Sequence, residues 1–466
     1  MKKQWFTGSY VKFAIIFVAL IILLVTPMIR GSHPGTESYL NLRLAEDPGI
    51  YDDLSFGGRI AAYSWGTPLI LSAVPSFLVN LLPLLLGVLS IFVLSRIVKK
   101  FTSDTFLHNV VLMIYVFSPT FIYTFSSANN LFVPFFLSLI AFSLFTSEHW
   151  GWATALIVAL MPLFSIIATT SLLVVLFAYS FLWKGQRKKL FMILLLVGIL
   201  VSGLYYGYLL YSSGYTGGVS IGDSAEFGVF SQILYDLGSV YGIGIFIMIM
   251  SMVGMSSVWE EKYRNKFVFI SVGLLFVFSL FWTESLLLLN VFLCYFAGMG
   301  LLYLVNRRWT SINFKQFTLI LIVCGLLFSG VSQLSGLIKE DPNEGILNAL
   351  SFMEDEEQGV VFAHYSRGVW INYAGHANVL DENYAFVNDA EERFKDMNAL
   401  FYSRDLDESM ELIEKYDIDY IWIDEGYRDE VFEYDTQGLL FIAEYTKSFN
   451  QIYNKGGVEI WRIEKE

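Results

Sequence analysis

Cysteine and charged residues are scarce in this chain of 466 residues, and each scarcity excludes a class of protein. The only cysteines are Cys294 and Cys324. Both lie in apolar segments, so disulfides cannot brace the polar parts of the chain, and a cysteine-ligated metal site is excluded. Charged residues make up 16% and apolar residues 55%, a ratio that cannot coat a soluble globule of this length. Together with a mean hydropathy of +0.55, the composition indicates an integral membrane protein.

Apolar runs long enough to cross a bilayer recur along the first three quarters of the chain. A transmembrane helix needs about 20 apolar residues, within a range of about 17–25. On this basis the sequence predicts an α-helical polytopic bundle of about eleven spans. The spans are expected near residues 13–29, 76–95, 108–125, 131–146, 151–166, 167–183, 190–210, 240–258, 267–283, 285–305 and 316–337.

Basic residues are distributed unevenly between the predicted loops, and this sets the orientation of the bundle. With the N-terminus inside, the inner loops hold sixteen Lys and Arg residues, and the outer loops hold four. Because Lys and Arg are retained in the cytoplasm, we predict a multi-pass protein of the cell membrane with a cytoplasmic N-terminus and an extracytoplasmic C-terminal domain. A cleaved signal peptide is the alternative for the first segment, but VTPMIRGSH after it lacks a small-x-small cleavage site.

The tail of the chain differs in charge and pattern from the rest. From residue 340 onward there are 30 acids and 10 bases, whereas the preceding residues hold 13 acids and 20 bases. So acidic a tail is not expected to bind nucleic acid or an anionic lipid surface. We predict a transmembrane domain, 1–339, with a first outer loop at 30–66, and a soluble acidic α/β domain outside, 340–466. Within the tail, helices are predicted at 341–353, 390–401 and 407–416, strands at 359–365 and 419–423, and a hairpin at 449–463 that turns at 454–457.

The first outer loop concentrates charge beside the membrane. Between His33 and Arg59 it holds five carboxylates and two arginines. Charges close to a bilayer are expected to face water, a partner or a substrate. Turn signals bracket a helix predicted at 37–45, for which Thr36 is the candidate cap. This helix places Glu37 in its first turn, just beyond the end of the first span.

A second outer loop, Tyr211–Ser239, is rich in Gly, Ser and Tyr and holds Asp223, Glu226 and Asp236. Its glycines do not form a phosphate-binding motif on a strand–helix turn, which argues against nucleotide binding. The loop is interpreted either as a lid over an outer cleft or as a solvated connector.

These features resemble the GT-C superfamily of polytopic glycosyltransferases, such as protein O-mannosyltransferases, aminoarabinose transferases and oligosaccharyltransferases. GTESYLNLRLA, with Glu37 ahead of a Tyr and a helix, resembles the first-loop motif of that superfamily, and YDDLSFGGR with GTPL resembles its continuation. The resemblance covers the whole architecture. It implies transfer of a sugar from a polyprenyl-phosphate donor on the outer face of the membrane, with Glu37 as the catalytic acidic residue.

Two departures from the oligosaccharyltransferases narrow this resemblance. HYSRGVWINYAGHANVLDENY resembles the segment around their WWDYG motif, but Tyr365, Ser366, Arg367 and Gly368 stand at the W-D-Y-G positions. The Asp that helps to recognise a sequon Ser or Thr is therefore missing. The outer turn SSANN, residues 126–130, also has no acid where oligosaccharyltransferases keep a second metal-binding pair. Both departures favour a simpler transferase that uses a lipid-linked monosaccharide.

The candidate catalytic residues are three acids of the first outer loop. Transfer from a lipid phosphate needs a base that takes the acceptor proton. We expect Glu37 to be this base or to orient the acceptor, with Asp52 or Asp53 assisting it or binding a divalent cation such as Mg²⁺ or Mn²⁺. For the neighbouring pair, capping of the next turn is the competing interpretation. Without a second acidic pair or a His cluster, the argument for a cation is thin.

The same loop supplies the candidate substrate-binding residues. A positive group must hold the departing phosphate, and Arg43 or Arg59 is expected to contact it. A solvated helix face is the alternative for Arg43. Tyr39 and His33 complete the candidate binding set, although a lone histidine is more often a local hydrogen-bonding partner.

The expected partners are a polyprenyl-phosphate sugar donor, membrane lipid, and a lipid, glycan or protein acceptor. A polytopic transporter or flippase of a lipid-linked or small polar substrate is the main alternative. Coupled transporters place ionisable groups near the bilayer midplane and show inverted repeats, whereas the acids of this chain gather at the outer ends of its spans. A membrane-anchored receptor or scaffold is a third alternative.

Overall fold

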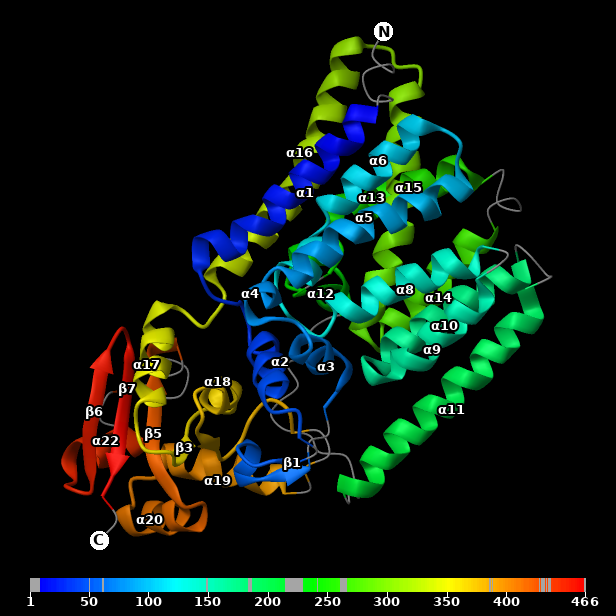
Figure 1. Ribbon diagram of the computed structural model, residues 1–466. Coiled ribbons are helices and arrows are strands. Elements are labelled where there is room, and N and C mark those ends of the chain that lie inside the picture. The colour runs from blue at the N-terminus through cyan, green and yellow to red at the C-terminus, as the bar shows by residue number, and fades with distance from the viewer. Residues whose placement is uncertain are drawn as a thin grey trace.

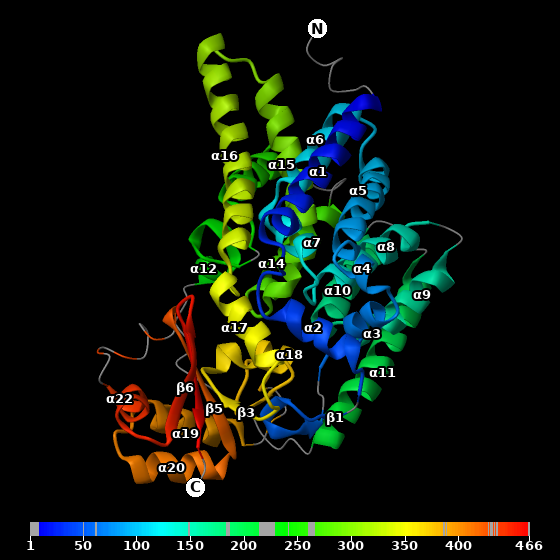
Figure 2. The same cartoon turned by 60° about the vertical axis from the view of Figure 1, so that its left-hand side comes forward.

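The computed structural model shows an elongated molecule with a helical bundle at one end and a mixed α/β domain at the other (Figure 1). It describes residues 9–464 apart from 50, 61–62, 148–149, 183–186, 214–228, 241, 260–265, 385–386, 388, 427, 429–431, 433 and 435–436. The start of the first helix and the C-terminal domain lie at opposite ends of the molecule in both views (Figures 1 and 2).

Each predicted span coincides with an apolar helix in the described part of the chain. Five helices are long enough to cross a membrane: α1 (Ser9–Arg30), α5 (Leu82–Phe101), α11 (Lys188–Ser213), α15 (Leu286–Asn306) and α16 (Ile312–Lys339). A sixth candidate span is a pair bent by 58°, α6 (Thr105–Val116) and α7 (Pro119–Ser126). Shorter apolar helices occupy the other positions: α8 (Phe132–Phe145), α9 (Gly151–Leu160), α10 (Ile166–Leu182), α13 (Ile245–Ser257) and α14 (Lys266–Ser279). The prediction of a polytopic helical bundle is therefore confirmed.

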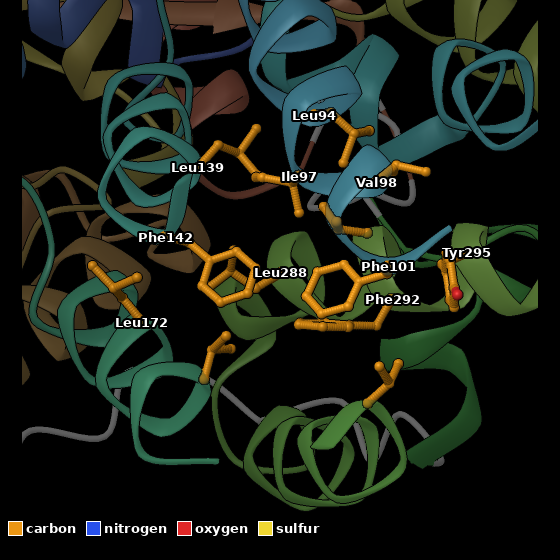
Figure 3. Close-up of a pocket in the computed structure, with 13 residues that line it drawn as sticks. Leu94, Ile97, Val98, Phe101, Leu139, Phe142, Leu172, Leu288, Phe292 and Tyr295 are labelled. Carbon is orange, nitrogen blue, oxygen red and sulfur yellow. The ribbon is translucent and has the colours of Figure 1, made fainter. Parts of the chain in front are cut away.

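The bundle is held together by close helix packing. A Cβ added to Gly254 of α13 would lie 1.9 Å from the carbonyl oxygen of Phe296 in α15, and one added to Gly300 would lie 2.3 Å from that of Met250. Glycine is thus needed where the two backbones touch. Within the bundle, Phe101, Phe142 and Phe292 surround an apolar cavity of about 30 Å³ (Figure 3). That cavity is a small gap in the core, too small and too apolar to hold a polar headgroup.

The structure describes only part of the second outer loop, and the described end of the loop is hydrogen-bonded to two helices of the bundle. Residues 214–228, with Asp223 and Glu226, lie outside the described residues. After the short helix α12 (Val229–Ile233), Asp236 accepts hydrogen bonds from the N–H of Ile245, at 2.6 Å, and from the hydroxyl of Ser329. Asp236 therefore fixes the start of α13 to α16.

The C-terminal domain is built on a five-stranded mixed sheet in the order β4-β3-β5-β7-β6. Its strands are β3 (Val360–Phe362), β4 (Ala377–Asn378), β5 (Ile418–Asp424), β6 (Phe449–Lys455) and β7 (Val458–Ile463). Its helices are α17 (Glu344–Glu354), α18 (Gly368–Tyr373), α19 (Ala390–Tyr402), α20 (Leu406–Lys415) and α22 (Gly438–Tyr445). Gly456 and Gly457, at φ +63° and +77°, form the two-residue turn of the β6–β7 hairpin. The predicted helices, strands and hairpin of the tail are all present.

Alternation along β5 separates two hydrophobic cores on the two faces of this sheet. Ile421 and Ile423 face a core that includes α19, α20 and α22, whereas Tyr420 and Trp422 face a core that includes α17 and α18. Figure 2 shows α19, α20 and α22 beside the sheet, with α17 and α18 on the side nearer the bundle.

The first outer loop is part of this domain. Its helix α2 (Glu37–Glu46) packs beside α18, with Tyr39, Leu40 and Leu44 in the core that contains α17. After the short strand β1 (Tyr51–Asp52), Phe56 enters the opposite core and is 3% exposed. Its backbone N–H donates to the side chain of Asn378 at 2.9 Å. The loop and the tail therefore share both cores.

Candidate active site

Helix α2 starts directly after a turn that leads out of α1. Gly35, at φ +73°, makes the turn and donates its N–H to the carbonyl oxygen of Asp341 at 2.8 Å. The prediction that Thr36 caps the helix is wrong, because its backbone is already helical and its hydroxyl donates to Glu382 of the C-terminal domain at 2.8 Å. The Thr36 hydroxyl is directed at this carboxylate and accepts no N–H of the first turn of α2.

Glu37 is the first residue of α2 and contacts the outer turn between α7 and α8. Its Oε2 accepts the backbone N–H of Asn130 at 3.2 Å. One helical turn further on, Asn41 donates to the carbonyl oxygen of Ala128 at 2.8 Å. Burial raises the pKa of Glu37, the hydrogen bond from Asn130 opposes this shift, and the charge of Glu284 adds to it. The carboxyl is therefore more basic than an exposed one.

Three further acids from distant parts of the chain surround Glu37. Glu284, between α14 and α15, accepts the hydroxyl of Ser165 at 2.5 Å. The charge of Glu37 also acts on Glu340, just past α16, and on Glu382. Even so, no three His, Cys, Asp or Glu side chains in the described part of the chain are grouped closely enough to hold a metal ion.

A cavity of about 390 Å³ lies between α2, the 126–130 turn and the C-terminal domain. It is lined by Leu40, Asn41, Leu44, Tyr63, Ser64, Asn130, Glu382, Asn383 and Tyr384. At about 100° per residue, Asn41 and Leu44 lie within about 40° of Glu37 around the helix axis. The face of α2 that carries Glu37 is therefore the one that borders this cavity, which we call the front cavity.

Asp52 and Arg43 form a paired, buried cluster. Arg43 donates to both carboxylate oxygens of Asp52, at 2.7 and 2.5 Å, and the hydroxyl of Tyr63 donates to Asp52 at 2.9 Å. Burial by itself would raise the pKa of Asp52. The hydrogen bonds and charge of Arg43, together with the N–H of Ser55, outweigh the effect of burial, so the pKa of Asp52 lies below its usual value. Asp53, the next residue, is exposed. The pair therefore joins α2 to β1.

Arg59, in the strand β2 (Arg59–Ile60), is stacked between two aromatic rings behind the front cavity. Its guanidinium lies 4.8 Å from the ring centre of Phe56 and 4.9 Å from that of Tyr63. It donates to the hydroxyl of Tyr63 at 2.6 Å and approaches Asp381 at 3.9 Å. Its Nε and Nη1 are buried and have no hydrogen-bond partner among the described residues. Arg59 therefore places a positive charge directly behind one wall of that cavity.

The other two candidate binding residues lie elsewhere. His33 is hydrogen-bonded to Asn80 at 2.8 Å, and the buried ring of Tyr39 meets Tyr373 edge-on at 5.0 Å. Tyr39 is about 200° around α2 from Glu37. The structure therefore brings Tyr39 and His33 together, but on the opposite face of the helix.

At the W-D-Y-G positions of the tail, an arginine forms an ion pair within the C-terminal domain. Arg367 donates to both carboxylate oxygens of Asp424, at 2.9 Å each, and packs on the ring of Trp370 at 5.1 Å. Its guanidinium also lies 3.7 Å from Asp341, in the connection between α16 and α17. Arg367 thus fixes this segment to the connection that leads out of the membrane.

Sequence reasoning named none of the residues that line the front cavity as site residues, and two of them, Asn130 and Glu382, act directly on Glu37. Asn130 acts through its backbone N–H, which has no sequence signature. Glu382 stands in an irregular stretch of an acidic tail, with nothing to distinguish it from the other acids. Proximity to Glu37, which only the folded chain creates, identifies both.

Comparison with known proteins agrees with this architecture. No protein-family model and no curated protein sequence matches the chain. Among solved structures, the oligosaccharyltransferase of Archaeoglobus fulgidus in its apo form matches with a TM-score of 0.66 at 11% identity, over 90% of this chain and 70% of that one. AglB from the same organism, in complex with an inhibitory peptide and a dolichol-phosphate, matches at 0.64 and 10% identity, over 97% and 74%. ArnT from Cupriavidus metallidurans bound to undecaprenyl phosphate matches at 0.57 and 10% identity, over 96% and 97%. The chain therefore has the fold of the GT-C polytopic membrane glycosyltransferases.

Proposed function

We propose that this protein transfers a sugar from a polyprenyl-phosphate donor to an acceptor at the outer face of the membrane. The observation that carries the proposal is the position of Glu37, a carboxyl of raised pKa that accepts the N–H of Asn130, a residue of the wall of the front cavity. Solved structures with the same fold hold dolichol-phosphate or undecaprenyl phosphate, the class of lipid that such a donor would leave.

In the proposed reaction, Glu37 is the general base. Its carboxylate takes the proton of an acceptor hydroxyl while the acceptor oxygen bonds to the anomeric carbon of the sugar. The bond between that carbon and the phosphate oxygen breaks, and polyprenyl phosphate leaves with the electron pair. The raised pKa of Glu37 makes it a stronger base than an exposed carboxylate. No step is assigned to the exposed Asp53 or to a metal ion.

Two other residues of the loop have supporting roles in this proposal. Arg59 is the candidate for the negative charge of the phosphate, because two of its nitrogen atoms have no hydrogen-bond partner among the described residues and its charge lies behind Tyr63. Arg43, whose two terminal nitrogen atoms donate to Asp52, instead positions α2 against β1. A lipid-linked monosaccharide is the proposed donor, because Arg367 is paired with Asp424 where oligosaccharyltransferases read a sequon.

The excess of Lys and Arg in the inner loops supports a cytoplasmic N-terminus and a C-terminal domain outside. The reaction would then occur at the outer leaflet, which the donor reaches after it has crossed the membrane.

The test is turnover by the purified protein in sealed proteoliposomes. A radiolabelled polyprenyl-phosphate monosaccharide is supplied, and release of polyprenyl phosphate is followed together with movement of the label between leaflets. We expect release of polyprenyl phosphate with appearance of label in an acceptor fraction. Movement of intact donor across the bilayer without cleavage would instead identify a flippase and overturn the proposal.

A further inference from the structure

A second cavity, of about 490 Å³, lies on the other side of α2. Its wall is formed by the turn after α1, by one face of α2, by the short helices α3 (Gly66–Ser72) and α4 (Ser76–Val79), and by α17 and α18 of the C-terminal domain. This volume falls within the range of about 300–1,000 Å³ that is typical of ligand sites. We call it the rear cavity.

The rear cavity is separate from the front cavity. Tyr39 and Glu46, which line it, lie about 180–200° around the helix from Glu37. It begins, however, at the turn that leads into α2, and Glu37 is the first residue of that helix. A ligand in the rear cavity would therefore be separated from Glu37 by the thickness of one helix, and by less at the helix start.

The polar groups of the rear cavity are suited to an uncharged ligand. None of its described lining residues is a lysine or an arginine. The charge of Arg30 acts on His33 and Tyr39, but its guanidinium donates to the carbonyl oxygens of Leu337 and Pro342. His33 faces the side-chain oxygen of Asn80, which leaves the amide N–H groups of Asn80 to donate to a ligand. Burial lowers the pKa of His33, which keeps the ring neutral. The hydroxyl of Tyr373 and the carboxylate of Glu46 add further hydrogen-bonding groups.

The rest of the rear cavity is apolar and close to lipid. Leu71, Val74 and Val79 line it from α3, α4 and the connection between them. Just beyond, Leu81 and Leu85, at the start of the membrane helix α5, are 40% and 49% exposed. We therefore place the cavity beside the bilayer surface, where a membrane lipid presents its headgroup.

We propose that the rear cavity binds the neutral sugar headgroup of a membrane glycolipid. A sugar ring has hydroxyls for Asn80, Tyr373 and Glu46, and a C–H face that packs on aromatic rings. The attached acyl chains would extend along Leu71, Val74 and Val79 into the membrane. Binding of the glycolipid does not depend on the proposed function. A role for the same glycolipid as the acceptor of the transferred sugar rests on that function.

The test measures lipid binding with no donor present. The full chain is placed in phosphatidylcholine nanodiscs, and monoglucosyl diacylglycerol is titrated in. Phosphatidylglycerol with the same acyl chains is the comparison lipid. Native mass spectrometry counts the lipid molecules bound to the protein. We expect the glucolipid to bind at least tenfold more tightly than phosphatidylglycerol. Equal binding of the two lipids would overturn the proposal.

Variants assign the binding to the rear cavity. Asn80→Leu and Tyr373→Ala should each weaken glucolipid binding about tenfold, whereas Tyr402→Ala, an exposed tyrosine on α19, should not. Asn80 is exposed, so its replacement should leave the melting temperature unchanged and keep the test valid if Tyr373→Ala unfolds. Wild-type binding by Asn80→Leu would contradict the assignment. Glu37→Gln should bind the glucolipid normally, so loss of transfer and loss of binding are separable.

Discussion

Replacement of Glu37 by Gln tests the proposed base with little disturbance of the fold. Glu37 makes one hydrogen bond that matters for its position, from the N–H of Asn130 to Oε2 at 3.2 Å. The amide oxygen of Gln can accept the same bond, and Gln has nearly the same shape. Removing a partly buried carboxyl whose pKa is raised also relieves a desolvation cost, so the variant should be no less stable than the wild type.

The expected loss of activity follows from the role of a general base. Proton transfer to a positioned side chain contributes about 10²–10⁴-fold to a rate. At about 1.36 kcal/mol per tenfold, this is roughly 2.7–5.4 kcal/mol in the activation free energy. The loss should appear in kcat, with the KM for the donor nearly unchanged, because Glu37 is not assigned a contact with the departing phosphate.

The pH dependence gives a second readout of the same variant. The base must be ionised, and burial raises the pKa of Glu37, so wild-type activity should fall on acidification while the pH is still above the usual range of a carboxyl. Residual activity of Glu37→Gln should lack that acid limb.

The assay follows release of polyprenyl phosphate in proteoliposomes as the pH is varied. Asp47→Asn, an exposed acid just past the end of α2, is the matched control and should keep the wild-type rate. If Glu37→Gln transfers sugar at the wild-type rate, or keeps the acid limb, the assignment of the base is refuted.

Four further predictions follow from the loop. Asp52→Asn leaves Arg43 buried without its counter-charge and should lower the free energy of unfolding by about 3–5 kcal/mol, measured as a lower melting temperature in detergent. The control Asp53→Asn replaces an exposed acid and should change this free energy by less than about 0.5 kcal/mol. Equal effects of the two variants would contradict the buried pair. Phe56→Ala removes a ring that is 3% exposed and should cost about 3 kcal/mol and open the loop to limited proteolysis; an uncut loop would count against the shared cores. Arg59→Ala should raise the KM for the donor roughly tenfold or more, and unaltered donor affinity would remove this residue from the site. Transfer should persist in EDTA, because no three described acids or histidines are grouped to hold a cation; loss that Mg²⁺ or Mn²⁺ restores would contradict this.

The sequence was a good guide to elements that depend on local pattern. Apolar runs located the helices of the bundle because any segment of that composition must leave water. A short apolar run located β5 as a buried strand. Turn residues located the β6–β7 hairpin, since two adjacent glycines allow the positive φ angles of a tight turn. The charge of the first outer loop likewise marked the region in which Glu37 lies beside the front cavity.

The roles of individual residues within the loop were less predictable. Five carboxylates and two arginines in one segment are consistent with many pairings, and composition does not choose among them. The structure pairs Arg43 with Asp52, stacks Arg59 on Tyr63 and leaves Asp53 exposed. Asp52 ends β1 and accepts the N–H groups of Leu54 and Ser55, whereas Asp53 stands in the bend that follows the strand and is exposed.

What the sequence by itself determined is the class of protein, the bundle, the acidic α/β tail and the place to look for chemistry, because each depends on composition or short-range periodicity. Only the tertiary structure decided which residues surround Glu37. Thr36 and Glu382 are separated by 346 positions in the chain yet share a hydrogen bond, and Asn130 reaches Glu37 across 93 positions. The two cavities on opposite faces of α2 exist because the loop, the bundle and the C-terminal domain pack against one another, and no local pattern records that contact.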